Sequence, residues 1–352
     1  MRRLVALLAP ATTALMTFRA PLVADGYVAS SSGDALLLYL PGFDGANLAP
    51  FLQWPALQDA GFDVRCARVD EGDRSTFEEL TTTAAAYIDK EAKNRPCLLI
   101  GESFGGALAT VVAQRVSSVE GVVLVNPATS YAESALAARA PSILKLPAFL
   151  YYFGLVSLLP LFVDKHGVRA LWDIITNKRL PCVIETPRQE AYMGRVALSL
   201  PDRIASMPRE TLAWRLREWL DVGACVDVAT LKKPTLVVFG DDDNTLPSER
   251  EAARVVSVIT NAGGRASQAR VPGAGHAATL GSRVDLRAEV AAFFCDEPAF
   301  SAFLAGAPRK MRPDASQEGE ASSLFGLYPR VHAPVSVFDY YNAENDARTA
   351  IR

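Results

Sequence analysis

The most informative segment of the chain reads Cys97-Leu98-Leu99-Ile100-Gly101-Glu102-Ser103-Phe104-Gly105-Gly106. Its apolar start predicts a buried strand, and the glycine-flanked serine predicts a sharp turn from that strand into a helix. The serine backbone is strained at such a turn, and side chains two residues before and after it would collide with the strand and the helix. Gly101 and Gly105 avoid that collision, and Gly106 leaves room for close helix packing. The pattern is typical of a nucleophile elbow, which presents Ser103 to a substrate.

A second segment fits around that serine. The apolar run Ala35–Leu40 predicts a strand, and Pro41-Gly42-Phe43-Asp44-Gly45 follows it. In the α/β-hydrolase fold the loop after such a strand donates one backbone N–H to an oxyanion hole, and the residue after the nucleophile donates the other. We therefore predict that the amides of Phe43 and Phe104 stabilise the charge of a tetrahedral intermediate. The alternative for residues 41–45 is an ordinary turn at the end of a strand.

An acidic run follows another predicted strand, residues 235–240. It reads Asp241-Asp242-Asp243-Asn244-Thr245-Leu246-Pro247, and the acid of a hydrolase triad sits on the loop after such a strand. The spacing from Gly240 and to Pro247 favours Asp243 among the three consecutive aspartates. The alternatives are a solvated acidic turn and a metal-binding patch. Because no ligand spacing flanks the run, it is poor evidence for a metal, and we expect no metal site.

The chain has three histidines, His166, His276 and His332. His276 follows the last predicted strand, residues 268–271, in a glycine-rich loop. The order Ser103, Asp243, His276 is the chain order of the α/β-hydrolase triad. We predict that His276 takes the proton of Ser103 as general base, while Asp243 holds the imidazole tautomer. The product of the first half-reaction is an acyl-serine. Water or an alcohol then accepts the acyl group.

Strand and helix patterns alternate along most of the chain. Strands are predicted at 35–40, 63–69, 96–100, 121–125, 235–240 and 268–271, and helices at 76–94, 105–117, 248–260 and 284–296. This alternation predicts an α/β fold with a mostly parallel sheet flanked by helices. We assign residues 33–130 and 229–296 to an α/β-hydrolase core, 131–228 to a cap inserted after the strand at about 121–125, and 297–352 to a linker and partial C-terminal segment.

The predicted cap contains an uncharged apolar run, Leu146–Val163, whose eighteen residues reach the lower limit of a membrane span. Pro147, Gly154 and Pro160 interrupt it. We therefore predict a helical lid that lines an acyl-chain pocket and contacts a membrane surface, with a true membrane span as the alternative. The substrate-binding residues expected from this run are Leu150, Phe153 and Leu159.

Composition excludes several other classes. Half of the residues are hydrophobic and the net charge is −3, and no basic patch with interleaved aromatic residues indicates nucleic-acid binding. The five cysteines are scattered and odd in number, so we expect free thiols in a reducing compartment, with Cys66 and Cys97 buried in strands. Without a phosphate-binding or dinucleotide fingerprint, no cofactor is expected.

Residues 1–32 are predicted to be a targeting leader outside the fold. Met1-Arg2-Arg3 gives a basic start, and Leu4–Met16 is an apolar run of signal-peptide length. The Phe18-Arg19-Ala20-Pro21 that follows makes the segment similar to the bipartite plastid presequences of algae with complex plastids. A plastid location is therefore expected, and a secretory or membrane-associated location is the alternative.

Taken together, the motifs resemble the plastid esterase/lipase/thioesterase family that includes the plant phytyl ester synthases, which also acylate diacylglycerol. The resemblance covers roughly residues 35–296 and is weakest in the cap. It rests on five matching segments: Leu40–Gly45, Asp73–Leu80, Gly101–Gly106, Asn126–Tyr131, and Gly275-His276 followed by Val284-Asp285-Leu286.

The resemblance implies acyl transfer from a lipid donor (acyl-CoA, acyl-carrier protein or galactolipid) to phytol or diacylglycerol. Family members usually carry a second, acyltransferase-like domain with a His-x-x-x-x-Asp motif. Here Asp339 follows His332 by seven residues rather than five. We therefore expect the tail to be the stub of that domain in a truncated chain. The alternatives are a carboxylesterase for small esters and a non-catalytic lipid-binding protein with the same fold.

Overall fold

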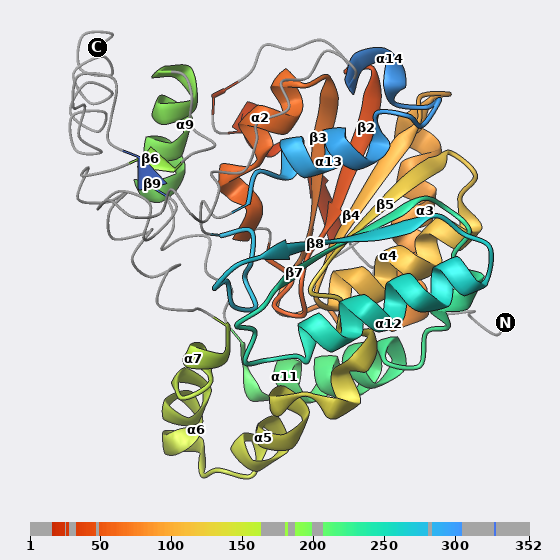
Figure 1. The fold of residues 1–352 in the computed structure, drawn as a ribbon. Helices are drawn as coiled ribbons and strands as arrows, with labels where there is room; N and C mark the ends of the chain where they lie inside the picture. Colours follow the sequence, from red (N-terminus) through yellow and green to blue (C-terminus); the bar gives the residue numbers. More distant parts are fainter. Residues whose placement is uncertain are drawn as a thin grey trace, which may run out of the picture.

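A seven-stranded sheet forms the central layer of the protein (Figure 1). We describe a computed structural model, which covers residues 16–24, 26–27, 33–46, 49–162, 180–181, 187–198, 207–280, 284–304 and 327–328. The strand order is β1-β3-β2-β4-β5-β7-β8, in which β1 is antiparallel to its neighbour and all other pairs are parallel. The strands are β1 (Met16–Arg19), β2 (Ala35–Leu40), β3 (Phe62–Val69), β4 (Cys97–Glu102), β5 (Val119–Val125), β7 (Thr235–Gly240) and β8 (Ala266–Val271). A separate two-stranded pair joins β6 (Leu180–Pro181) to β9 (Leu327–Tyr328).

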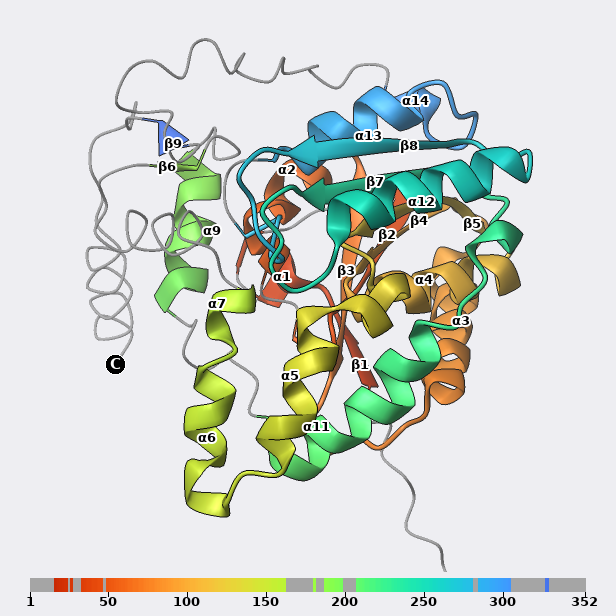
Figure 2. The ribbon, with the colours of Figure 1, turned by 60° about the horizontal axis from the view of Figure 1, so that its bottom comes forward.

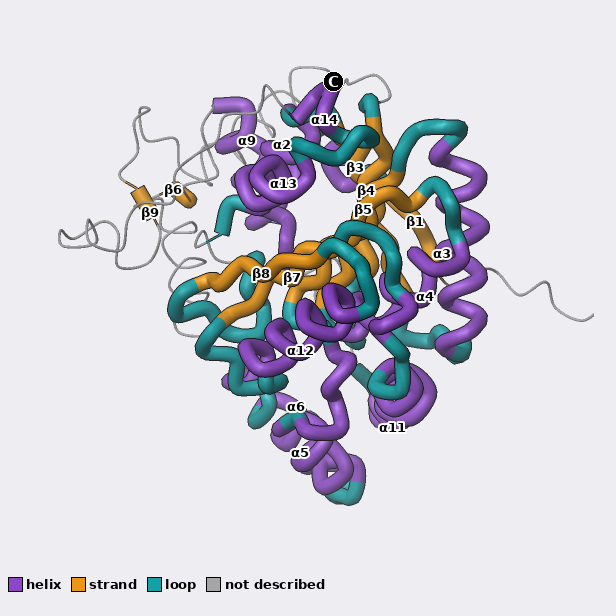
Figure 3. The backbone as a smooth tube through the Cα atoms, turned by 45° about the vertical axis from the view of Figure 1, so that its right-hand side comes forward, coloured by secondary structure: helices purple, strands orange, loops and turns teal. Residues whose placement is uncertain are grey.

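Helices cover both faces of the sheet (Figure 3). Side chains alternate along each strand, so Leu36 and Leu38 of β2 pack into one core, while Leu37 and Tyr39 pack into the other. The helices on the first face are α3 (Phe77–Ala92), α4 (Phe104–Arg115) and α12 (Ser248–Asn261). The second face is covered by α1 (Pro21–Ala24), η1 (Ala49–Leu52), α2 (Trp54–Asp59), α13 (Leu286–Phe294) and α14 (Ser301–Leu304). The predicted α/β class with a mostly parallel sheet is confirmed.

The strand order places a topological switch point between β2 and β4. From β2 the chain moves to β3 on one side and then crosses to β4 on the other side. The connections therefore leave β2 and β4 in opposite directions, and ligands of open α/β sheets bind at such a switch point, outside the carboxyl ends of the strands. The loop after β2 and the turn after β4 meet there, and these are the loops that carry Phe43 and Ser103.

Every strand and helix expected between residues 35 and 296 is present, with bounds that differ by a few residues. The predicted burial of Cys66 and Cys97 is also confirmed, because both thiols lie in central strands and are fully buried.

The N-terminal boundary of the fold differs from the expectation. Residues 1–32 were expected to lie outside the fold, but Met16–Arg19 forms β1 and pairs with the outer edge of β3. Phe18 stacks on Tyr87 of α3 with ring centroids 3.8 Å apart, and Leu22 of α1 is buried. An uncovered β3 would expose a row of unpaired backbone groups, and β1 satisfies them. Residues 1–15 of the predicted leader lie outside the described residues.

The C-terminal boundary of the core also shifts. The core was expected to end at residue 296, yet Phe300 and Leu304 are buried in the second core cluster, and Phe300 packs on Phe62 and Phe294. Apolar side chains at 300 and 304 lie one helical turn apart, which explains why this short segment folds onto the sheet. The polar run 309–323, expected to be a linker, lies outside the described residues.

The described parts of the predicted cap are mostly helical. Its helices are α5 (Ala135–Leu144), α6 (Ala148–Val156), α7 (Leu159–Phe162), α9 (Pro187–Leu198) and α11 (Arg209–Arg215), which runs into the π-helical turn η3 (Leu216–Asp221). Figure 2 shows α6 at the outer edge of the molecule, away from the sheet. Leu212, Trp219 and Leu220 belong to the same core cluster as the sheet, and so do Ile143 of α5, Tyr151 of α6 and Leu161 of α7. Among the helices of the described segments, none is long and apolar enough to cross a membrane.

The close approach of α4 to β2 yields a prediction about stability. A Cβ atom at Gly105 would lie 2.1 Å from the carbonyl oxygen of Leu40, which is backbone and has no room to move away. We expect Gly105→Ala to lower the free energy of unfolding by about 3 kcal/mol, because overpacking forces the helix off the sheet. Urea denaturation measures the change. Gly72→Ala is the control, since a Cβ there meets nothing within 4 Å and should change stability by less than about 0.5 kcal/mol. Equal midpoints for both variants would contradict the steric argument.

Candidate active site

Ser103 lies at the turn between β4 and α4 in a strained conformation. Its φ of +55° and ψ of −118° are rarely adopted by a residue with a side chain. Two features of the turn hold it there. Gly101 lies so close to Gly105 that a Cβ on Gly101 would be 2.2 Å from the Gly105 carbonyl oxygen, and the Ser103 amide donates a 2.9 Å hydrogen bond to the carbonyl oxygen of Val125. Backbone strain of this kind persists only where the surrounding structure imposes it, and it clusters at active sites.

Three side chains predicted from the sequence meet at this turn. The Nε2 atom of His276 lies 3.0 Å from the Oγ atom of Ser103, and its Nδ1 atom lies 2.8 Å from Oδ2 of Asp243. An ionised carboxylate can only accept, so Nδ1 carries the proton and Nε2 is free to accept from the Ser103 hydroxyl. Ser103 and His276 are each 6% exposed. The structure thus brings the three residues together in the geometry that a serine nucleophile and its base require.

The structure also distinguishes the three consecutive aspartates. Asp243 accepts hydrogen bonds from the amides of Thr245 and Leu246 and from the hydroxyl of Ser248, in addition to His276. The carboxylate of Asp241, in the same loop, instead pairs with Arg270 and accepts a hydrogen bond from the amide of Gly273. Asp243 is therefore the aspartate that faces the histidine.

Burial and nearby charges shift the pKa values of His276 and Asp243. Burial opposes the charged form of His276, but the nearby carboxylates of Asp243, Glu102 and Asp44 outweigh it and raise the pKa above its ordinary value of 6.5. Burial likewise disfavours ionised Asp243, yet His276 and the hydrogen bonds lower its pKa overall. The surrounding carboxylates therefore stabilise the imidazolium that develops when His276 accepts a proton.

Glu102, the residue before the serine, is a buried acid beside this pair. It is 5% exposed, and the hydroxyl of Tyr39 donates a 2.7 Å hydrogen bond to its Oε2 atom. Burial raises its pKa to about 7. The sequence indicates Glu102 only as part of the elbow, because a glutamate at the end of a strand carries no sign of burial.

Asn126 is a second residue that sequence reasoning did not assign. Its buried side chain donates to the carbonyl oxygens of His276, at 2.6 Å, and Gly275, and accepts from the amide of Gly240. Its φ of +42° is a conformation that asparagine tolerates better than most residues. Asn126 therefore ties the ends of β5 and β7 to the histidine loop.

The loop after β2 packs directly against the elbow. A Cβ at Gly42 would lie 3.7 Å from the Cβ of Ser103. The amide of Gly45 donates to the carbonyl of Gly42 at 2.9 Å, and Gly45 has a φ of +74°. Phe104 is the first residue of α4, where N–H groups have no partner inside the helix. Phe104 thus follows Ser103 directly, and Phe43 follows the glycine that lies close to it; their role as an oxyanion hole stays a prediction.

The end of α7 covers the site. The ring of Phe162 lies 5.9 Å from the His276 ring and 5.7 Å from the Phe43 ring. The Thr245 hydroxyl donates to Leu161, and the amide of Ala277 donates to Phe162. The cover therefore contacts the loops of the acid, the histidine and the predicted oxyanion hole.

Two of the three residues expected to line a pocket face outward instead. Leu150 and Phe153 of α6 are 38% and 75% exposed, and the side chain of Leu159 lies outside the described residues. Tyr151 is the buried residue of α6, and it donates a hydrogen bond to the carbonyl of Met207. The run of apolar residues is therefore split between an outward face on α6 and a cover formed by α7.

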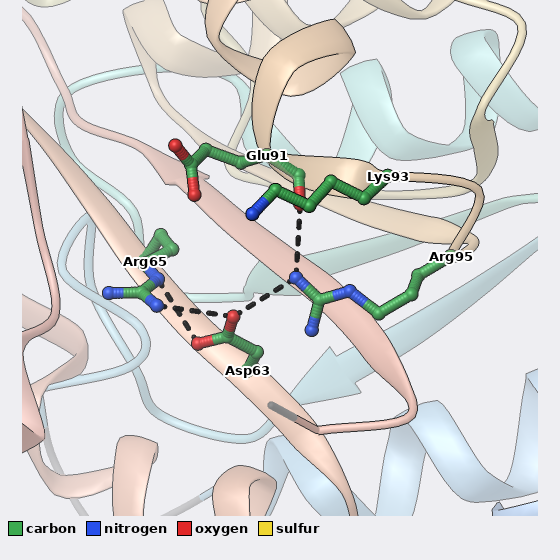
Figure 4. Close-up of a pocket in the computed structure, with 5 residues that line it drawn as sticks. All are labelled: Asp63, Arg65, Glu91, Lys93 and Arg95. Atoms are coloured by element: carbon green, nitrogen blue, oxygen red, sulfur yellow. Dashed lines mark hydrogen bonds and ion pairs between the residues drawn. The ribbon is translucent and has the colours of Figure 1, made fainter. Parts of the chain in front are cut away.

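A polar pocket lies elsewhere, at the other end of β3 (Figure 4). It has a volume of about 420 Å³ and is lined by Asp63, Arg65, Glu91, Lys93 and Arg95. Asp63 pairs with both Arg65 and Arg95. Because Asp63 lies at the start of its strand and Ser103 follows the end of β4, this pocket is separate from the serine site. Over the described part of the chain, no group of three or more His, Cys, Asp or Glu residues is placed to hold a metal ion.

Comparison with known proteins supports these observations. A family model described as the alpha/beta hydrolase family matches residues 7–293. The chain belongs to this family. The predicted fold is confirmed, and so, at the level of the family, is the prediction that the chain is a hydrolase or acyltransferase.

Two curated relatives from Arabidopsis thaliana confirm the predicted resemblance of this chain to the phytyl ester synthases. Phytyl ester synthase 1, chloroplastic, is 31% identical over 232 residues, which are 64% of this chain and 32% of the relative. Phytyl ester synthase 2, chloroplastic, is 28% identical over 244 residues, 64% of this chain and 33% of the relative. The chain therefore spans about a third of the length of these relatives.

Solved structures share the fold of this chain. MenH from S. aureus has a TM-score of 0.50 and 17% identity, covering 83% of this chain and 98% of that one. The enol-lactonase from Burkholderia xenovorans has a TM-score of 0.50 and 18% identity, covering 72% of this chain and 87% of that one. At this identity the likeness concerns the fold alone.

The buried acid yields a prediction about His276. Because the charge of Glu102 favours the imidazolium, Glu102→Gln should lower the pKa of His276, towards or below 6.5. NMR titration of the histidine ring signals measures this shift, with assignment from His166→Gln and His332→Gln. Glu120→Gln, at the opposite end of β5, should leave the His276 pKa unchanged. A His276 pKa that stays constant or rises in Glu102→Gln would contradict the proposed electrostatic contact.

Proposed function

We propose that the protein is a serine acyl hydrolase or acyltransferase that works through an acyl-serine at Ser103. The observation that carries the proposal is the hydrogen-bonded series Asp243–His276–Ser103, with the serine held at a strained turn. Membership of the alpha/beta hydrolase family supports it.

In the first half-reaction the Oγ atom of Ser103 attacks the carbonyl carbon of an ester or thioester, and Nε2 of His276 takes the hydroxyl proton. The amides of Phe43 and Phe104 donate to the oxyanion of the tetrahedral intermediate, and each such donor contributes about 10²–10³ in rate. When the intermediate collapses, the leaving alcohol or thiol takes the proton from His276. Water or an acceptor alcohol then attacks the acyl-serine and gives its proton to His276. The bond from the acyl group to Ser103 Oγ breaks, the serine takes the proton back, and the free acid or the new ester leaves; Asp243 stabilises the imidazolium in both halves.

The proposed substrates are lipid acyl groups. The names of the two curated relatives favour phytol as an acceptor and a plastid as the location. The apolar cover over the site, with Leu158, Leu161 and Phe162, is suited to an acyl chain. The proposed donors are acyl-CoA, acyl-carrier protein or a galactolipid, and the proposed acceptors are phytol or diacylglycerol. Residues His332 and Asp339 of the tail lie outside the described residues.

The test is a product analysis with a matched labelling experiment. The purified chain is incubated with a long-chain acyl-CoA, with and without phytol or diacylglycerol. We expect ester in the presence of acceptor and free fatty acid in its absence, and a fluorophosphonate probe should label Ser103. Ser103→Ala should lose both labelling and product formation, by at least about 10³-fold, because the nucleophile is gone. Ser130→Ala, a serine in the 3-10 helix η2 (Ala128–Glu133) after β5, is the control and should retain both.

The outcomes separate the alternatives. Free fatty acid alone indicates a hydrolase, and hydrolysis of short esters without activity on long chains indicates a small-ester carboxylesterase. A Ser103→Ala variant with full activity would overturn the serine mechanism. A folded wild-type chain with no product and no label would support the lipid-binding alternative instead.

We also infer that α6 docks on an anionic lipid surface, from which the acyl substrate would reach the site. Five of the seven large hydrophobic side chains that are exposed in the described part of the chain lie on this one helix: Phe149, Leu150, Tyr152, Phe153 and Val156. From Ser134 to Val163 the charged residues are Arg139 and Lys145, which are both basic and exposed. A helix face with aromatic residues and flanking cations suits the interface of a bilayer, where the rings insert and the cations meet anionic headgroups.

Vesicle sedimentation tests this docking. We expect the chain to bind vesicles of phosphatidylcholine mixed with phosphatidylglycerol more tightly than vesicles of phosphatidylcholine alone. Phe149→Ser with Phe153→Ser should weaken binding at least tenfold, because burying each phenylalanine contributes about 1.5–3 kcal/mol. The control is Val23→Ser with Val222→Ser, two exposed valines elsewhere. Equal losses in both variants, or self-association through α6 without lipid, would contradict the inference.

A further inference from the structure

We propose that Arg215 and Trp219 are positioning residues that together hold both halves of the oxyanion hole. This inference rests on the proposed function, which assigns the amides of Phe43 and Phe104 to that hole. The two residues lie four positions apart where α11 passes into η3, and both are fully buried. Each contacts one of the two oxyanion residues.

Arg215 fixes the first half. Its Nη1 atom donates to the carbonyl of Phe43 at 2.8 Å, and its Nη2 atom donates to the carbonyl of Asp70 at 2.8 Å, just after the end of β3. The guanidinium therefore bridges the oxyanion loop and the sheet, and hydrogen bonds from a charged donor are about twice as strong as neutral ones.

The contact of Arg215 completes the immobilisation of Phe43. The peptide group before Phe43 is held through its oxygen, because the amide of Gly45 donates to Gly42. In a trans peptide the N–H points away from the carbonyl, so this bond also fixes the direction of the Phe43 N–H. The peptide group after Phe43 is held by Arg215. With both flanking peptide planes held, the Phe43 amide cannot rotate away from Ser103.

Trp219 fixes the second half. Its ring stacks on the ring of Phe104, with centroids 4.9 Å apart and an angle of 13° between the planes. Its Nε1 atom donates to the carbonyl of Ser75 at 2.8 Å, which holds the ring in place. The guanidinium of Arg215 lies 4.4 Å from the Trp219 ring, so the two contacts form one connected unit.

The test compares variants that keep the fold but loosen this unit. Arg215→Lys keeps the charge but cannot bridge two carbonyl groups with a planar fork. Active sites are counted by complete titration with a fluorophosphonate, and kcat and KM are measured per titrated site with a soluble p-nitrophenyl ester. We expect kcat to fall about 10- to 100-fold with little change in KM, because a small displacement of a catalytic donor has effects of this size. A trifluoromethyl ketone, which forms an oxyanion adduct with the serine, should lose affinity by a similar factor.

The matched control is Arg95→Lys. Arg95 also donates to backbone carbonyls, of Gly33 and Glu91, but at the opposite end of β3, in the pocket of Figure 4. It should lower the melting temperature without changing kcat per titrated site. An unchanged kcat in Arg215→Lys, or an equal loss in Arg95→Lys, would overturn the positioning role.

A second pair of variants covers the case in which Arg215→Lys does not fold. Trp219→Phe loses the hydrogen bond to Ser75 but keeps a ring against Phe104, and Trp219→Leu removes the ring as well, so the leucine variant should lose more kcat per titrated site. Equal kcat values for these two variants would also contradict the proposal. A wild-type chain that is neither labelled nor active would instead overturn the proposed function, so the two failures are distinguishable.

Discussion

The site depends on how closely the first turn of α4 approaches the end of β2. The backbone of Gly105 lies so near the Leu40 carbonyl that no side chain fits between them. This contact aims the start of the helix at the loop after β2, and it leaves Ser103 as the residue that must take the unusual backbone conformation. The nucleophile and the loop of Phe43 are therefore placed by the same backbone contact, before any side chain of the site contributes.

The other loops are tied to this point by buried polar side chains. Asn126 joins the histidine loop to the ends of β5 and β7, and Asp243 is held by two amides and a hydroxyl from its own loop. Hydrogen bonds of this kind are costly to leave unmade inside a protein. The loops that carry His276 and Asp243 therefore have little freedom, although they come from parts of the chain that are distant from Ser103.

The sequence predicts the fold and the three central side chains because their signals are local. A strand, a glycine-flanked serine and a histidine in a glycine-rich loop can each be found within about ten residues, and their order along the chain is that of one fold. The roles of Asn126, Arg215 and Trp219 depend on contacts between distant segments, which no local pattern encodes. The apolar run around Leu150 and Phe153 shows a third case, since hydrophobic residues look alike in sequence whether they line a pocket or face solvent. For the same reason the sequence does not distinguish β1 from a leader, because its apolar residues look alike in either setting.

The edge strand β1 constrains how the N-terminal segment can be processed. A peptidase that removed every residue up to Ser32 would strip β3 of its antiparallel partner and expose Tyr87, on which Phe18 stacks. The newly bare strand would then be open to pairing with another chain. Any cleavage that preserves this sheet would have to fall before Met16, a limit that the signal-like composition alone does not set.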